Sequence, residues 1–178
     1  MTTPGRMFAA ATAVLLLFLT ACGEDEKKRV DPEDVPEGTV ISVEELASDH
    51  VAGDLEYPQS PPVGGAHNPV WLSCGVYTEP VPDENAVHSM EHGAVWISYA
   101  EDLPEDQVAT LTAFADEHDY LVIAPYLGLS SPIVLTAWGY QLSLDDADDP
   151  RVAQFIDVFE EGAQAPEAGA SCTGGAMP

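Results

Sequence analysis

The stretch AVWISYAEDLPEDQVATLTAFADEHDYLVIAPY, residues 94–126, decides the fold. It begins with a run of β-branched and aromatic residues of strand length, 94–99, and it ends with a second such run, 121–126. Between the two runs, residues 104–118 place apolar side chains at helical spacing behind a Pro-Glu start. The stretch therefore predicts a strand, a helix and a second strand.

The same patterns continue toward the C-terminus. Residues 133–138 are a third apolar run of strand length, and residues 150–161 carry an apolar stripe at helical spacing. On the N-terminal side, residues 40–46 fit a short strand or turn, and residues 57–78 are rich in Pro and Gly and predict loop structure. We therefore expect a single α+β domain, with one mainly antiparallel sheet covered by two helices.

The composition excludes some classes of protein. The chain has 178 residues, with 31 Asp and Glu against 5 Lys and Arg, and its formal net charge is −26. Such a surface repels phosphate backbones, so we expect no nucleic-acid partner. The hydrophobic share of 46% is large enough for a folded core. The acidic run at residues 145–149 is better explained as the cap of the following helix than as a calcium loop, because it lacks the ligand spacing and glycine of an EF-hand.

The N-terminus predicts export. Arg6 precedes a short apolar run at residues 8–19, and Leu19-Thr20-Ala21-Cys22 resembles a bacterial lipobox, in which the cysteine becomes the lipid-modified N-terminus. Residues 1–21 are thus predicted to be a signal peptide, although an unprocessed signal anchor is the alternative. Acyl chains on Cys22 would hold the protein at the outer face of the plasma membrane, with the membrane as its partner. The charged residues 22–37 would form a disordered tether.

Export also bears on the two remaining cysteines. An oxidising compartment allows Cys74 and Cys172 to form a disulfide. This bond would connect the Gly-, Ala- and Pro-rich tail at residues 163–178 to a globular domain at residues 38–162. A pair of thiolate metal ligands is the alternative, although neither cysteine belongs to a Cys-x-x-Cys motif.

The chemistry-bearing residues gather just before the first strand, in the segment Val87-His88-Ser89-Met90-Glu91-His92-Gly93. On a helix His88, Glu91 and His92 share a face, whereas in an extended chain His88, Met90 and His92 do. The helical set suits Zn, and the extended set, with its thioether, suits copper. His67, in the Gly/Pro-rich loop, is the candidate for a further ligand. We therefore predict a metal site for Zn or Cu.

Two other functions remain open for these residues. The motif His-x-x-Glu-His is that of the inverted zinc peptidases, in which the Glu activates a zinc-bound water. Such enzymes carry the motif in a long helix, yet Gly93 and a strand-like run follow here at once. Alternatively, the histidines are structural, and hydrogen-bond to carbonyls of the Gly/Pro-rich loop. In that case the domain would be a non-catalytic interaction module of the cell envelope, with a protein partner that the sequence does not identify.

Several separate motifs occur in an order that resembles the bacterial family called domain of unknown function 3105. They are Tyr57-Pro58 with Pro61-Pro62, Gly64-Gly65-Ala66-His67, Cys74-Gly75-Val76-Tyr77, Val87-His88-Ser89-Met90-Glu91-His92-Gly93-Ala94-Val95 and Thr136-Ala137-Trp138-Gly139. The ending at residues 166–172 is similar to that of the actinobacterial branch. Met90 stands where the family's usual form has Leu, which weakens the case for a methionine ligand. The resemblance implies a secreted or membrane-anchored protein and implies no particular activity.

Overall fold

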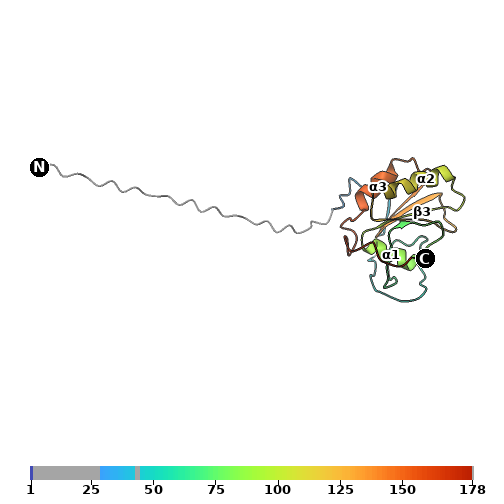
Figure 1. The fold of residues 1–178 in the computed structure, drawn as a ribbon, viewed down its shortest axis with the longest axis horizontal. Coiled ribbons are helices and arrows are strands. Elements are labelled where there is room, and N and C mark those ends of the chain that lie inside the picture. Colours follow the sequence, from blue (N-terminus) through green and yellow to red (C-terminus); the bar gives the residue numbers. More distant parts are fainter. Residues whose placement is uncertain (2–28, 43–44, 178) are drawn as a thin grey trace.

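The structure, a computed structural model, describes residue 1, residues 29–42 and residues 45–177 (Figure 1). Residues 2–21 of the predicted signal peptide and Cys22 lie outside these residues. In the part of the chain that is described, no helix is long and apolar enough to cross a membrane.

The three apolar runs form the three central strands of one sheet. They are β3 (Val95–Tyr99), β4 (Leu121–Pro125) and β5 (Ile133–Ala137), and every residue in them is buried. Shorter or more exposed strands flank them: β1 (Val40–Ile41), β2 (Gly75–Val76) and β6 (Tyr140–Leu144). Among the described residues the strand order is β1-β6-β5-β3-β4-β2. The predicted central strands are therefore confirmed.

The sheet is mixed. β3 pairs in parallel with β4 and antiparallel with β5, so that Ile97 lies opposite both Ile123 and Leu135. A parallel pair needs a crossover connection, and α2 (Glu105–Ala113) with the 3-10 turn at residues 114–116 supplies it. β2 is parallel to β4, whereas β1, β6 and β5 are joined by antiparallel pairs. The chain is thus a single α+β domain, as expected.

Helices cover both faces of the sheet (Figure 1). Alternate residues of a strand point to opposite faces, and on β3 Ile97 joins the core cluster beneath α2 and α3 (Arg151–Phe159), while Trp96 joins a second cluster beneath α1 (Asp83–Glu91). The sequence predicted α2 and α3. Within the described residues α1 is a third helix, and it carries the histidine motif.

The two ends of the domain are attached to it. At the N-terminal end, where a tether is predicted over residues 22–37, the described part contacts α3: Gln154 donates a hydrogen bond to the carbonyl of Asp34 and Arg151 donates one to the carbonyl of Glu37. At the C-terminal end, the predicted disulfide between Cys74 and Cys172 is confirmed, with Cα atoms 5.3 Å apart. This bond holds the tail next to β2 and α1.

Candidate functional site

Helix α1 determines which residues of the histidine motif meet. A helical period of 3.6 residues places His88, Glu91 and His92 on one face, and all three are almost fully buried, at 3%, 3% and 5% exposure. Met90 lies on the opposite side of the helix and packs in the hydrophobic cluster with Trp96. The helical alternative from the sequence is therefore the one that forms, and the structure does not bring Met90 to the imidazoles.

The Gly/Pro-rich loop brings His67 to the same face. Gly64 and Gly65 both have positive φ, at 139° and 115°, which other residues rarely adopt. This conformation lets the Gly65 carbonyl face the ring of His67, which is 0% exposed. The predicted ligand from a distant part of the chain is thus adjacent to α1.

A fourth histidine, His50, joins the cluster through the backbone. Residues 49–51 and His67 form a parallel bridge, in which the N–H of Val51 donates to the His67 carbonyl at 2.7 Å and the N–H of His67 donates to the Asp49 carbonyl at 3.0 Å. The His50 ring stacks on the His88 ring with centroids 4.7 Å apart. Its side chain is 45% exposed, so His50 forms the solvent side of the cluster.

One carboxylate oxygen lies among these imidazoles. Oε2 of Glu91 is 3.0 Å from Nε2 of His67, 3.5 Å from Nε2 of His50 and 3.9 Å from Nε2 of His88. Ligand atoms of all four residues lie within 4.8 Å of one another. Two atoms bound to one tetrahedral Zn²⁺ at about 2.0–2.1 Å are themselves about 3.3–3.4 Å apart. The distances from Oε2 of Glu91 are close to this value, so the four side chains could hold a metal ion after small movements.

Hydrogen bonds fix the orientation of three of the rings. Nδ1 of His67, His88 and His92 lies 2.7, 2.6 and 2.7 Å from a backbone carbonyl oxygen. A carbonyl only accepts hydrogen bonds, so each Nδ1 carries a proton and Nε2 is the ring nitrogen that remains for a metal ion. The accepting carbonyls belong to Gly65, Asn68 and Ser171. Histidines that bind metals are oriented in this way, through the ring nitrogen that does not bind the ion.

Burial favours the neutral form of His88. Its pKa is lowered from 6.5 to about 4, mainly by loss of solvent and in smaller part by the neighbouring rings of His92, His67 and His50, against the Asn68 carbonyl, which raises it. At neutral pH the Nε2 lone pair of His88 is therefore available to a cation.

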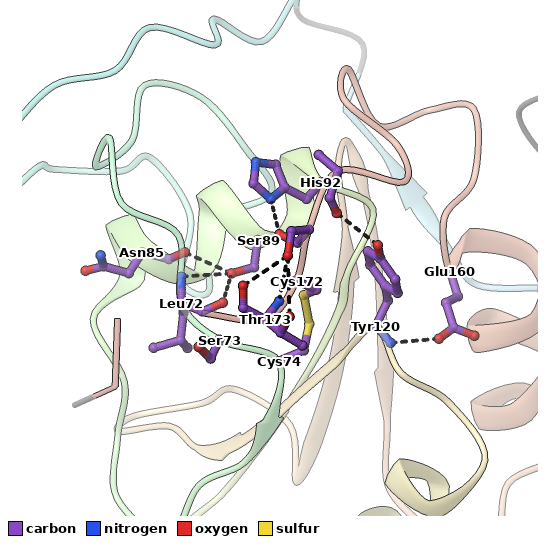
Figure 2. The surroundings of a disulfide bond; sticks show 12 residues. Leu72, Ser73, Cys74, Asn85, Ser89, His92, Tyr120, Glu160, Cys172 and Thr173 are labelled. Carbon is purple, nitrogen blue, oxygen red and sulfur yellow. Dashed lines mark hydrogen bonds between the residues drawn. A yellow bond between two sulfur atoms is a disulfide. The ribbon is translucent and has the colours of Figure 1, made fainter. Parts of the chain in front are cut away.

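The C-terminal tail adds a second group of ligand atoms, which shares Glu91 with the first. Ser171, next to Cys172 of the disulfide, accepts the hydrogen bond from His92, and Figure 2 shows His92 beside this disulfide. Glu91, His92 and Glu167 have ligand atoms within 4.8 Å of one another, and Nε2 of His92 is 3.8 Å from Oε2 of Glu167. The tail is therefore part of the site.

Sequence reasoning missed His50 and Glu167. Neither belongs to a spaced motif with another ligand residue, and both reach the site only through backbone pairing in the folded chain. The Gly/Pro-rich surroundings, which drew attention to His67, are absent around His50. In the tail, Cys172 was the one available signal, because its disulfide is what holds the tail against the domain.

The fold and the site define a single α+β domain with a buried cluster of histidine and glutamate side chains. The chain belongs to the family described as "Protein of unknown function (DUF3105)", which matches residues 50–174. The matched stretch contains every residue of both ligand groups and both disulfide cysteines. No curated protein and no solved structure matches the chain.

Proposed function

We propose that this protein is an exported, membrane-anchored lipoprotein that binds a divalent transition-metal ion through His50, His67, His88 and Glu91. The observation that carries the proposal is the convergence of Nε2 lone pairs on one carboxylate oxygen, with the other nitrogen of the His67 and His88 rings occupied by a carbonyl. Without a cation, His67 would need a second proton, on Nε2, to hydrogen-bond the Glu91 carboxylate.

The donor set favours zinc. Three imidazole nitrogens and one carboxylate oxygen form a borderline-hard, four-ligand set, and no sulfur ligand accompanies it because Met90 packs in the core. Cu²⁺ is the next candidate, since imidazole also suits it. The net charge of −26 raises the local concentration of cations around the domain.

The test is metal loading of the full chain, purified without metal-affinity steps and dialysed against Zn²⁺. His88→Asn is the informative variant, because an amide can still donate to the Asn68 carbonyl while the Nε2 ligand is lost. His118→Asn is the matched control, since His118 pairs with Glu160 at 2.6 Å and belongs to neither ligand group.

We expect bound Zn²⁺ by elemental analysis in the wild type and in His118→Asn, and a loss of at least tenfold in affinity in His88→Asn. Binding should also raise the melting temperature, because the folded state alone presents the site. If no metal binds to the wild type, the histidines only connect the Gly/Pro-rich loop to α1, and the domain is an interaction module of the envelope.

The location is tested separately. Cys22→Ser removes the residue that the lipobox-like sequence marks for cleavage and acylation, so we expect an acylated Cys22 at the N-terminus of the wild type and an unacylated variant that keeps residues 1–21, by mass spectrometry of the N-terminal peptide. A wild type without acyl chains on Cys22 would contradict the proposed anchor.

The peptidase alternative has less support. Helix α1 ends at Glu91, and the Glu91 carboxylate is buried against His67 rather than open to a substrate. Peptidase activity would be revealed by hydrolysis of an unstructured protein that disappears in Glu91→Gln while metal stays bound.

A further inference from the structure

Two groups of ligand atoms share one residue, Glu91. The first group joins it with His50, His67 and His88, the second joins it with His92 and Glu167, and within each group the ligand atoms lie within 4.8 Å of one another. A carboxylate has two oxygens and can contact two cations at once. Two groups of ligands that share one carboxylate are typical of a two-metal centre, in which the ions lie about 3.5–4 Å apart.

The lone pair of His92 is the second observation. Its Nδ1 donates to the Ser171 carbonyl, so in the neutral ring Nε2 has no proton to offer. This Nε2 lies 3.0 Å from Nε2 of His88, whose own proton is on the side of the Asn68 carbonyl. Two Nε2 atoms at this distance, in residues almost fully buried, need either a second proton on one ring, which makes the contact a hydrogen bond, or a cation beside them.

The backbone positions Glu167 next to this lone pair. The N–H of Glu167 donates to the carbonyl of Glu91, and the N–H of Gly169 donates to the carbonyl of His92, both at 3.0 Å. The tail thus runs alongside the end of α1 and carries a carboxylate to the open side of His92. The Glu167 side chain is 58% exposed, so an ion held there would also be in contact with solvent.

We infer that the protein binds a second divalent cation through Glu91, His92 and Glu167, with Glu91 bridging the two ions. This inference rests on the proposed metal binding at His50, His67 and His88. The two sites differ in kind: the first has four protein ligands, whereas the second has three and an open position toward solvent. Metal sites with three protein ligands leave a place for water or an anionic ligand, so exchangeable ligands bind at the second ion.

The charges of the ligand side chains are compatible with two bound cations. Glu91 and Glu167 contribute two negative charges, and the imidazoles are neutral ligands in the tautomers that the carbonyls fix. One nitrogen and two carboxylates form a harder set than that of the first site, which suits Zn²⁺ or Mn²⁺. The second ion should therefore bind more weakly than the first.

The test is the number of Zn²⁺ ions per full chain, measured by native mass spectrometry across a titration and checked by elemental analysis. Glu167→Gln removes a charged ligand from an exposed position without disturbing the core. Glu117→Gln, at another exposed glutamate outside both ligand groups, is the matched control. His92→Asn is the second variant, because its amide can still donate to the Ser171 carbonyl.

We expect two Zn²⁺ in the wild type and in Glu117→Gln, and one in Glu167→Gln and in His92→Asn. One Zn²⁺ in every protein would overturn the second site and leave the proposed function intact. Two ions retained in Glu167→Gln would overturn the assignment of Glu167 as a ligand. No Zn²⁺ in the wild type would overturn both the inference and the proposed function.

Discussion

Nε2 of His88 lies 3.0 Å from Nε2 of His92, and each ring already donates its Nδ1 proton to a carbonyl, that of Asn68 and that of Ser171. The two carbonyls belong to segments far apart in the sequence, the Gly/Pro-rich loop and the disulfide-bonded tail. Two separate parts of the chain therefore orient the two imidazoles at the end of α1. This arrangement connects the stability of the fold with the geometry of the site.

The disulfide should control metal affinity. It closes a separation of 98 residues, and closing a loop of that length stabilises the folded state by about 4–5 kcal/mol in the chain-entropy model. Its loss also leaves Ser171 and Glu167 held beside α1 by noncovalent contacts alone. We expect the Cys74→Ser, Cys172→Ser double variant to unfold at lower urea concentration and to bind Zn²⁺ about 10–100-fold more weakly, as for other residues that orient a ligand.

Affinity is best compared by calorimetry at a temperature at which the double variant is still folded. Unchanged affinity in the folded variant would contradict the role of the tail, even if stability falls.

Ser89 joins α1 to the loop before β2. Its hydroxyl donates to the Leu72 carbonyl at 2.7 Å and accepts from the Leu72 N–H at 3.0 Å, and the residue is 0% exposed (Figure 2). Ser89→Ala leaves the Leu72 carbonyl without this partner, and an unsatisfied buried group costs about 1–3 kcal/mol. Urea unfolding of Ser89→Ala should therefore show a free energy of unfolding lower than that of the wild type by an amount in that range. Thr110→Ala, whose hydroxyl makes an exposed bond within α2, should cost less; equal losses would count against this explanation.

Gly93 allows the segment after α3 to approach the end of α1. Its φ is 105°, and a Cβ added there would lie 2.9 Å from Cα of Glu161. We expect Gly93→Ala to be more destabilising than Gly128→Ala, because Gly128 also has positive φ, at 72°, but has open space around it. Gly128→Ala is the control, because it should lose only the free energy of backbone strain, about 1–2 kcal/mol. Chemical denaturation of the two variants measures the difference, and a smaller loss in Gly93→Ala would refute the close approach.

The stability of the metal-free protein should depend on the protonation of His88. The pKa of His88 is lowered from 6.5 to about 4 by burial, so between these pH values the unfolded chain binds a proton that the folded chain does not. Stability contributed by His88 is therefore complete above about pH 6.5 and decreases as the pH falls toward 4. In EDTA, the midpoint of urea unfolding should fall more from pH 7 to pH 5 in the wild type than in His88→Asn. An equal fall in both would show that burial does not shift this pKa.

The sequence predicted the parts of the fold that local patterning determines. The apolar runs that became β3, β4 and β5 are each long enough to be recognised, and the stripe on α3 has a clear helical period. β1 lies within residues 40–46, where a short strand or turn was expected. β2 lies within residues 57–78, which were expected to be loop, because a strand of two residues depends on its partner strand more than on its own sequence. β6 has a partly alternating pattern that went unrecognised.

The candidate site was predictable only where its residues are close in the sequence. The spacing of His88, Glu91 and His92 indicates a shared helix face, and the choice of this face over the extended set with Met90 depended on whether α1 forms. His67 was identified by its loop. His50 and Glu167 are brought in by backbone hydrogen bonds between distant segments, which no spacing in the sequence encodes.

Anomalous diffraction from crystals of the Zn²⁺-loaded protein, recorded on both sides of the zinc absorption edge, tests the central claim most directly. The account predicts an anomalous peak about 2.0–2.2 Å from Nε2 of His67 and His88 and from a carboxylate oxygen of Glu91. Crystals that contain Zn²⁺ but show no peak within bonding distance of these atoms would contradict it.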